Sequence, residues 1–572
     1  MPNHFHILIK LKEVIVYKHS NADRFKDTVG FETEEYNIAH NMIFNFKKKQ
    51  AEQLKASFGK LKDESYNFEL IEKYFRNKEH TETLQVLSDK TCKDLDFEEL
   101  FMFLDRTHSK PGQQYLYNKL RAIPNKPTNV DLDEKLIHLF TDDSDFRVEV
   151  QTQLEKLKGR EAYFVSSLFQ EAHLEQPKWF FILRLLSFTS VLSLVLLPFN
   201  AQMFFVLIGV FIVNICFHLW NKKNLSSYSD SIPQLMVLKR VANNLLHNEE
   251  IKKINPLLSE SIKILDQVRN RMFFFKLESK IEGDFQVIFW SFLELFKILF
   301  ILEPLLLFGV LKRLDCRRKE IEKVFIFVGR IDVLLSIASL RKGGDCCIPK
   351  IDEENSRMKA CEIYHPLIVN CVRNDIEVND KSILLTGSNM SGKTSLIRAI
   401  GINVLTGLTM NTCFAKSMMI PRICIYSAIR ISDDLMNDRS YYFEEVLTIK
   451  NMIDKSCNGK ASLFLLDEIF KGTNTVERIS AGKAVLSALA KNNNRVFVST
   501  HDIELTDLLE KEYELYHFSE LVSDKSVDFD YKLKEGKLKN RNAIRILEIN
   551  DFPELVIKEA MALAEELDRT RL

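Results

Sequence analysis

The chain has 572 residues, enough for about three or four domains, each with a core of its own. Lys plus Arg total 79 and Asp plus Glu total 79, so the formal net charge is zero and no protein-wide basic field points to nucleic acid. The ten cysteines include no CxxC pair and no Cys/His cluster with metal-ligand spacing, which excludes a zinc-finger class of protein.

Residues 1–80 form a small N-terminal region of unclear fold. MPNHFHILIKLKEVIVY alternates apolar and polar residues like a strand, whereas NMIFNFKKKQAEQLKASF has a helical, basic pattern. Residues 81–177 show helical patterns such as DFEELFMFLDRTHSKPGQQYLYNKLRAI. Pro111 and Gly112 mark a local interruption of this pattern. We therefore expect the first half of an α-helical core domain at 81–177.

Two apolar runs follow, Trp179–Leu197 and Met203–Trp220. Each is long enough to cross about 30 Å of hydrocarbon as a helix. The first run contains one charge, Arg184, which can reach outward, and the second contains none. Trp179 and Trp220 lie at the outer ends, beside lysines, where indole rings favour the headgroup zone.

This pattern predicts a transmembrane helical hairpin over residues 178–223. The positive flanks place both ends in the cytoplasm, with a very short loop outside. The localisation that follows is the cytoplasmic membrane, with soluble domains facing the cytoplasm. The alternative is a helical hairpin buried in a large soluble core, in a cytoplasmic protein.

A third apolar stretch, Phe285–Lys312, is a poorer candidate for a membrane span. Glu294, Lys297 and Glu303 interrupt it, and Pro304 breaks or kinks a helix. A third crossing would also place the domain before the hairpin on the opposite side from the C-terminal domain. We expect a helix packed in the protein or lying on the membrane surface.

Residues 224–347 otherwise show long, amphipathic and charged helical patterns, which we interpret as the second half of the helical core with its lever helices. From residue 348 onward short β-rich runs alternate with helices: SILLTG, a helix from Lys393, RICIYSAI, ASLFLLDE, a helix from Glu477, and RVFVST. This alternation predicts a parallel sheet covered by helices.

One segment fits the phosphate loop G-x-x-x-x-G-K-[ST] at every fixed position: Gly387, Ser388, Asn389, Met390, Ser391, Gly392, Lys393 and Thr394. It lies between a predicted strand and a predicted helix, so backbone N–H groups and the helix N-terminus would face phosphate oxygens. Lys393 would reach the β- and γ-phosphates, Thr394 the magnesium, and Ser395 a neighbouring phosphate. The motif predicts ATP and Mg²⁺ as cofactors.

The strand ASLFLLDE supplies the partners of this loop. Asp467 lies at its C-terminal end, where it would hold Mg²⁺ through water, and Glu468 follows, able to polarise the attacking water. Thr500 and His501 follow another buried strand and reach the same edge, where the histidine can sense the γ-phosphate. We predict an α/β P-loop (ABC-type) ATPase domain at 348–572 that hydrolyses ATP, with Lys393, Glu468 and His501 as its catalytic residues.

Several segments together resemble the MutS family of DNA mismatch repair ATPases: TGSNMSGKTSLIRAIG, ISDDLMNDRSYYFEEV, LLDEIFKGTNT, STHDIELTDL and DRTHSKPGQQYLYNKLRAIP. The resemblance covers about residues 81–177 and 350–572. It implies that His365, in YHP, lies near the adenine and that Asn389 orders the γ-phosphate. It also implies that Ser440 reaches in trans into the partner's nucleotide site, supported by Glu445. A composite site of this kind implies a homodimer formed through the ATPase domain.

The chain departs from this family in several places. Arg439 stands where a Gln is usual before the serine, which affects the contacts made in trans. No segment matches the mismatch-reading domain or the connector domain, and the apolar hairpin takes the place of the DNA-clamping tip of the levers. No nuclease extension follows the last predicted helix.

Three functions follow from these features. The first is a dimeric ATPase that moves paired helical levers, with DNA as its partner and a role in mismatch repair or recombination. The second is a membrane-anchored ATPase that acts on a membrane or protein partner without mismatch recognition, held by residues 179–220. The third, a transporter subunit, fits worst, because no Leu-Ser-Gly-Gly-Gln-like signature precedes Asp467 and two spans are too few for a pathway.

Overall fold

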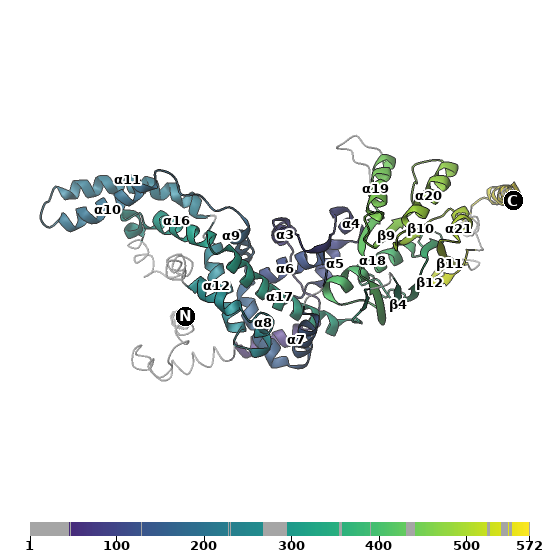
Figure 1. Ribbon diagram of the computed structural model, residues 1–572, viewed down its shortest axis with the longest axis horizontal. Helices are drawn as coiled ribbons and strands as arrows, with labels where there is room; N and C mark the ends of the chain where they lie inside the picture. The colour runs from purple at the N-terminus through teal and green to yellow at the C-terminus, as the bar shows by residue number, and fades with distance from the viewer. Residues whose placement is uncertain are drawn as a thin grey trace.

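The structure, a computed structural model, describes residues 47–126, 129–226, 230–266, 294–353, 357–388, 390–430, 441–522, 527–538 and 552–570, with Asn45, Tyr228 and Leu547. The expectations for the N-terminal strand and for Asn389, Arg439 and Ser440 lie outside these residues. The molecule is elongated: a pair of apolar helices forms one end and a β-sheet with its helices lies toward the other (Figure 1).

Helices fill the chain before the C-terminal sheet. In chain order its described elements are α3 (Phe68–Arg76), β1 (Thr83–Val86), α4 (Asp89–Asp94), α5 (Phe97–Leu104), α6 (Lys110–Arg121), β2 (Ala122–Pro124), α7 (Val130–Asp142), α8 (Ser144–Leu154), η1 (Glu155–Leu157), η2 (Arg160–Val165), α9 (Ser167–Gln170), α10 (Phe180–Leu196), α11 (Met203–Ser226), α12 (Ser231–Leu245), α13 (Glu249–Lys252), α16 (Leu302–Asp315) and α17 (Arg318–Gly343). Strands β1 and β2 pair antiparallel. Residues 47–57 are helical, as their sequence pattern predicts.

The long helix α17 is the spine of this helical part, because it is buried along most of its length against α6, α7 and α12. Gly329 lets α6 approach closely: a Cβ there would lie 2.7 Å from Cβ of Tyr115. Pro111 and Gly112 lie in the first turn of α6, where a missing N–H costs no hydrogen bond, and Ser109 caps this helix.

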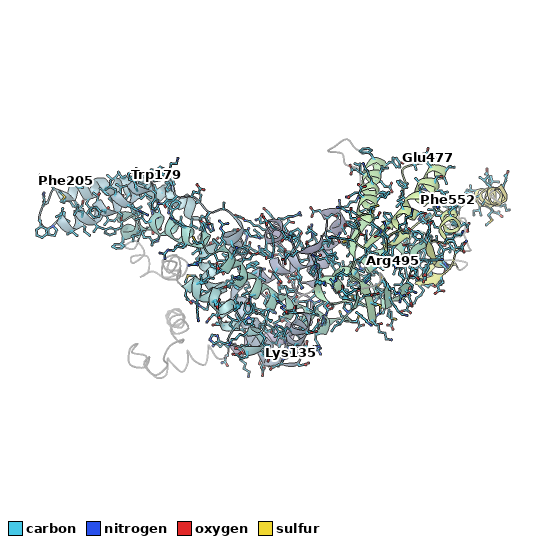
Figure 2. The ribbon with its side chains drawn as sticks, in the orientation of Figure 1. Lys135, Trp179, Phe205, Glu477, Arg495 and Phe552 are labelled. Carbon is cyan, nitrogen blue, oxygen red and sulfur yellow. The ribbon has the colours of Figure 1, made fainter. Side chains whose placement is uncertain are left out.

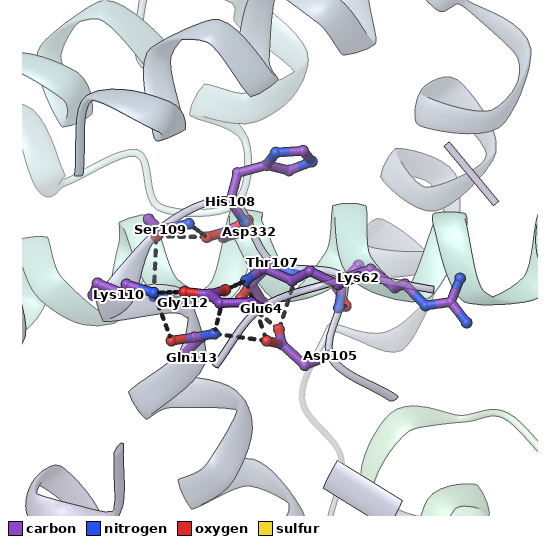
Figure 3. A network of polar contacts seen from close by, with 12 residues as sticks. Lys62, Glu64, Asp105, Thr107, His108, Ser109, Lys110, Gly112, Gln113 and Asp332 are labelled. Carbon is purple, nitrogen blue, oxygen red and sulfur yellow. Dashed lines mark hydrogen bonds and ion pairs between the residues drawn. The ribbon is translucent and has the colours of Figure 1, made fainter. Parts of the chain in front are cut away.

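A buried carboxylate fastens the start of α6 to the spine (Figure 3). Asp332 of α17 accepts hydrogen bonds from the amides of His108 and Ser109, both at 2.8 Å, and from the Ser109 hydroxyl. Burial raises the pKa of Asp332 to about 7. The two helices are therefore joined by directed polar contacts as well as by packing.

Helices α10 and α11 form a hairpin that projects from the helical part, with Phe205 at its tip and Trp179 at its base (Figure 2). The rings of Trp179 and Trp220 lie side by side at that base, with centroids 5.1 Å apart. Within α11, residues Met203–Asn221 form the one described helix that is long and apolar enough to cross a membrane. Helix α10 is shorter than expected, and its 17 residues reach about 26 Å.

The third apolar stretch is a broken helix. Residues 294–299 are helical, Ile301 has a left-handed φ of 50°, and α16 restarts at Leu302. Pro304 explains the break, because its ring would clash with the carbonyl of Phe300 in a continuous helix. Within the described residues, this segment packs against α10 and α11, as part of the protein.

The C-terminal part contains a six-stranded sheet in the order β12-β11-β6-β10-β9-β8, parallel except for β12. Its strands are β6 (Ser382–Thr386), β8 (Cys424–Ala428), β9 (Ser462–Asp467), β10 (Arg495–Ser499), β11 (Tyr513–Val522) and β12 (Val527–Glu535). A second sheet has the order β3-β7-β4-β5, made of β3 (Lys350–Asp352), β7 (Ser417–Pro421), β4 (Met358–Ile363) and β5 (Asn374–Val378). The helices are α18 (Lys393–Met410), α19 (Tyr441–Ser456), α20 (Thr475–Leu489), α21 (Glu504–Leu509) and α23 (Glu554–Thr570).

Alternate residues of the central strands face two cores. Ile383 and Leu385 of β6 belong to one core with α18 and the helical part, whereas Leu384 belongs to a second core with α19 and α20. The first core is continuous between the helical part and the sheet, so the two parts share buried apolar surface. The parallel sheet covered by helices agrees with the sequence-based expectation for this part of the chain.

Two carboxylates strengthen this junction near the sheet edge. Asp94 is buried and accepts hydrogen bonds from the Ser427 hydroxyl (2.7 Å) and from the amides of Ile429 (3.1 Å) and Arg430 (2.9 Å). Asp96 pairs with Arg430 at 2.6 Å and with Arg398 at 3.0 Å. Arg398 belongs to α18, the helix that follows the glycine loop, residues 387–394. The helical part is thus tied to the elements that carry the candidate site.

Candidate functional site

The glycine loop joins β6 to α18 at the carboxyl end of the parallel strands. Gly387 and Gly392 have positive φ values of 147° and 103°, which side chains rarely permit. A Cβ on Gly387 would lie 2.9 Å from Ser391 Oγ and 3.0 Å from the Phe518 carbonyl oxygen. The glycines therefore let the loop curl tightly over the start of the helix.

Lys393 and Thr394 open the helix and face the inside of this loop. The ammonium group of Lys393 donates to the carbonyl oxygens of Gly387 and Ser388, both at 2.8 Å, and burial lowers its pKa. The Thr394 hydroxyl donates to Asp467 Oδ2 at 2.7 Å, and the Ser499 hydroxyl donates to the other oxygen of Asp467. The strand register explains the second contact, because Ser499 of β10 pairs with Asp467 of β9.

Glu468 follows directly, and a histidine and a lysine hold its carboxylate. One carboxylate oxygen lies 2.8 Å from His501 Nε2 and the other 2.8 Å from Lys471 Nζ. The hydrogen bond with His501 lowers the pKa of Glu468 to about 2, and that with Lys471 adds to the effect. Glu468 is therefore ionised at neutral pH, a state in which it can orient and polarise a water molecule.

The loop after β9 has a strained backbone. Glu468 and Phe470 both have left-handed φ values, 54° and 61°, although neither is a glycine. The Glu468 amide donates to the Ser499 carbonyl oxygen at 3.0 Å, and the Phe470 amide donates to the buried carboxylate of Glu445 on α19. Burial raises the pKa of Glu445. Glu445 therefore fixes the loop that positions Glu468.

A pocket of about 500 Å³ opens beside the loop. Among its walls are these sequence-predicted residues: His365, Ser388, Met390, Ser391, Gly392, Lys393, Thr394, Ser395 and Glu468. His365 Nδ1 accepts a hydrogen bond from the Leu367 amide at 3.3 Å. Burial lowers the pKa of His365 to about 4, so its ring is neutral near pH 7 and can pack against an uncharged base.

Two aromatic walls of the pocket, Phe518 and Tyr531, come from the hairpin of β11 and β12. Asn374 of β5 holds this hairpin in place: its amide nitrogen donates to the Tyr531 carbonyl oxygen at 3.0 Å, and its oxygen accepts from the Leu533 amide at 2.8 Å. Sequence reasoning missed these residues, because no motif links them to a glycine loop far earlier in the chain.

The site residues fit a nucleotide with magnesium. The Ser388 hydroxyl is buried and has no hydrogen-bond partner among the described residues, as expected for a group that meets phosphate oxygens. Thr394 and Asp467 place a hydroxyl and a carboxylate together, the oxygen ligands that Mg²⁺ prefers. The structure brings the predicted Lys393, Asp467 and Glu468 together, whereas Asn389 and Ser440 lie outside the residues that it describes.

A parallel sheet with a glycine loop after one strand and an Asp-Glu pair after another defines a P-loop ATPase domain. Residues 383–568 match the family model described as MutS domain V. Residues 383–568 therefore form a domain of the MutS family.

Curated relatives that carry the name DNA mismatch repair protein MutS match the same half of the chain. The protein of Aquifex pyrophilus is 31% identical over 263 residues, that of Listeria monocytogenes serotype 4b 29% over 265, and that of Methanosarcina barkeri 27% over 281. The matched segments cover 44%, 44% and 46% of this chain, respectively. The chain spans 30% of the length of each of these relatives.

Proposed function

We propose that the C-terminal domain hydrolyses ATP with Mg²⁺. Lys393 and the loop amides bind the phosphates, Thr394 and Asp467 hold the magnesium, and Glu468 polarises the attacking water. His501, whose Nε2 lies 2.8 Å from the Glu468 carboxylate, orients that carboxylate and would sense the γ-phosphate. The observation that carries this proposal is the contact of Thr394 with Asp467, beside an ionised Glu468.

Steady-state phosphate release tests this activity. We expect Lys393→Ala to weaken ATP binding. We expect Glu468→Gln to bind ATP but to hydrolyse it at least about 100-fold more slowly than the wild type. Lys491→Ala and Glu98→Gln remove exposed charges of the same types and should behave like the wild type. Wild-type turnover in both site variants would refute the catalytic assignment.

We further propose that the protein works as a homodimer on DNA, in mismatch repair or recombination. The names of the relatives support DNA as the partner, and the family likeness supports a site completed in trans by Ser440. Continuous packing from the domain through α17 supports a lever that follows the nucleotide state. DNA binding should weaken steeply with salt, in proportion to the phosphates contacted, and no binding at low salt would contradict this partner.

A second candidate function is favoured by the hairpin of α10 and α11, whose outer surface is apolar and exposed. In this alternative the ATPase is anchored in the cytoplasmic membrane and moves a membrane or protein partner. Alkaline carbonate washing of cell membranes tests the anchor. Retention of the chain in the pellet supports it, and release into the supernatant would refute it.

A further inference from the structure

The hairpin of α10 and α11 buries polar side chains and exposes apolar ones. Its buried polar residues are Ser190, Ser193, Asn214, His218 and Asn221. Among its exposed large apolar residues are Phe181, Leu185, Phe188, Phe205, Ile212 and Leu219. A helix in water shows the opposite pattern, so this arrangement suits a hydrocarbon surrounding.

Asn214, His218 and Asn221 recur at helical spacing and form one buried stripe along α11. The side-chain amide of Asn214 donates to the carbonyl oxygen of Leu299 at 2.8 Å, at the break between residues 294–299 and α16. A broken helix leaves carbonyl groups without helical partners, which is tolerated at membrane depth only where protein satisfies them. Asn214 satisfies one of these carbonyl groups.

One turn further along the stripe, His218 meets charged residues of the broken segment. Its Nε2 lies 3.2 Å from Glu294 and its Nδ1 lies 3.3 Å from Glu303. Lys297 lies 3.2 Å from both carboxylates. The imidazole therefore lies between two carboxylates, and Lys297 contacts both of them from the broken segment.

The same residues could be considered as a metal site, since one ligand atom each from His218, Glu294 and Glu303 lie within 4.8 Å of one another. The geometry disfavours this, because the two carboxylates face different nitrogens of the imidazole, and a metal takes one. Lys297 also bridges the two carboxylates, in the position a cation would need. The group is better explained as a closed network of ion pairs.

We propose that residues 294–303 enter the lipid bilayer beside α11 as a re-entrant segment, held there by the network of contacts among His218, Glu294, Lys297 and Glu303. The proposal rests on the membrane-anchored candidate function. Charges in an apolar segment are tolerated in a membrane when they face inward and neutralise one another. Leu295 and Phe296 lie on the outer surface of this segment, where lipid would cover them.

Cysteine labelling with a membrane-impermeant maleimide, in open membrane fragments that hold the full-length protein, tests this placement. Cys216, Cys316 and Cys457 are all exposed in the structure, but only Cys216 lies in the hairpin. We expect Cys216 and an introduced Phe296→Cys to be protected. Cys316, Cys457 and an introduced Leu257→Cys, which replaces an exposed apolar residue outside the hairpin, should react.

The labelling results test the membrane anchor and the re-entrant segment separately. Rapid labelling of Cys216 would refute the membrane anchor itself. Protection of Cys216 with rapid labelling of Phe296→Cys would refute the re-entrant segment alone.

The ion-pair network is tested in the Phe296→Cys background. Lys297→Met leaves an uncompensated charge and should speed labelling of that cysteine by about tenfold or more. Adding Glu303→Gln removes one negative charge, which returns the network to its wild-type net charge, and should restore protection. Unchanged labelling in Lys297→Met, or no recovery in the double variant, would show that charge balance does not hold the segment. ATP turnover reports that each variant is folded.

Discussion

The hydroxyl of Thr394 donates a 2.7 Å hydrogen bond to Asp467, a residue that lies 73 positions later in the chain. One residue opens the helix after the glycine loop and the other ends a neighbouring strand, so the sheet itself sets their distance. Two oxygen-bearing side chains suited to Mg²⁺ are therefore already adjacent. They would need little movement when the ion binds.

This contact predicts that changes at Asp467 alter the magnesium concentration that ATP turnover requires. Asp467→Asn removes the negative charge but keeps the shape of the side chain, so the magnesium concentration for half-maximal turnover should rise about tenfold or more. Thr394→Ser keeps the hydroxyl and should stay close to the wild type. Magnesium titrations of ATP turnover measure both, and an unchanged requirement in Asp467→Asn would contradict its assignment to the magnesium site.

The pair of Glu468 and His501 predicts a change in acid stability. The pKa of Glu468 falls from 4.5 to about 2 on folding, so its ion pair stabilises the fold above pH 4.5 and this stabilisation is lost as the pH falls toward 2. In His501→Asn the pKa of Glu468 should return toward its ordinary value. Circular dichroism should then show acid unfolding at higher pH than in the wild type, and an identical acid midpoint would count against the pairing.

The contact between α6 and α17 predicts a packing phenotype. A Cβ on Gly112 would lie 2.1 Å from a carboxylate oxygen of Asp332, so Gly112→Ala should destabilise the protein by about 1–3 kcal/mol. Gly209 has no neighbouring heavy atom within 4 Å of such a Cβ, so Gly209→Ala is the matched control. Thermal unfolding compares the two, and equal melting temperatures would contradict the packing described for α6.

The contacts of Asp94 predict that a substitution at this residue weakens the junction between the helical part and the ATPase domain. Asp94→Asn turns an amide group toward two backbone amides and a hydroxyl, which should cost about 1–3 kcal/mol. Because the lost contacts cross the junction, proteolysis should also cleave more readily between the two parts. Resistance equal to that of the wild type would mean that other contacts carry the junction.

Much of the C-terminal fold could be predicted from the sequence, because its signals are local. The glycine loop is one short run, and α18 begins at Lys393 as expected. Helix α20 begins at Thr475, earlier than the expected Glu477, because Asn474 caps it. By contrast, the placement of Tyr531 in the pocket depends on strand pairing over a long separation, for which the sequence has no local signal.

The third apolar stretch shows the other limit of sequence reasoning. The charges of Glu294, Lys297 and Glu303 argued against a membrane location when each was considered singly. The structure pairs them with one another and with His218 on α11, a partner that no spacing rule indicates. Such partners offset part of the cost of placing a charge in an apolar setting, whereas an unpaired charge pays that cost in full.

The paired site can be tested most directly by mixing two inactive proteins, Lys393→Ala and Ser440→Ala. If each site combines Lys393 of one chain with Ser440 of its partner, a mixed dimer contains one intact site. An equal mixture should then recover about a quarter of wild-type ATP turnover by random pairing. Turnover no higher than the average of the two separate variants would contradict a site shared between two chains.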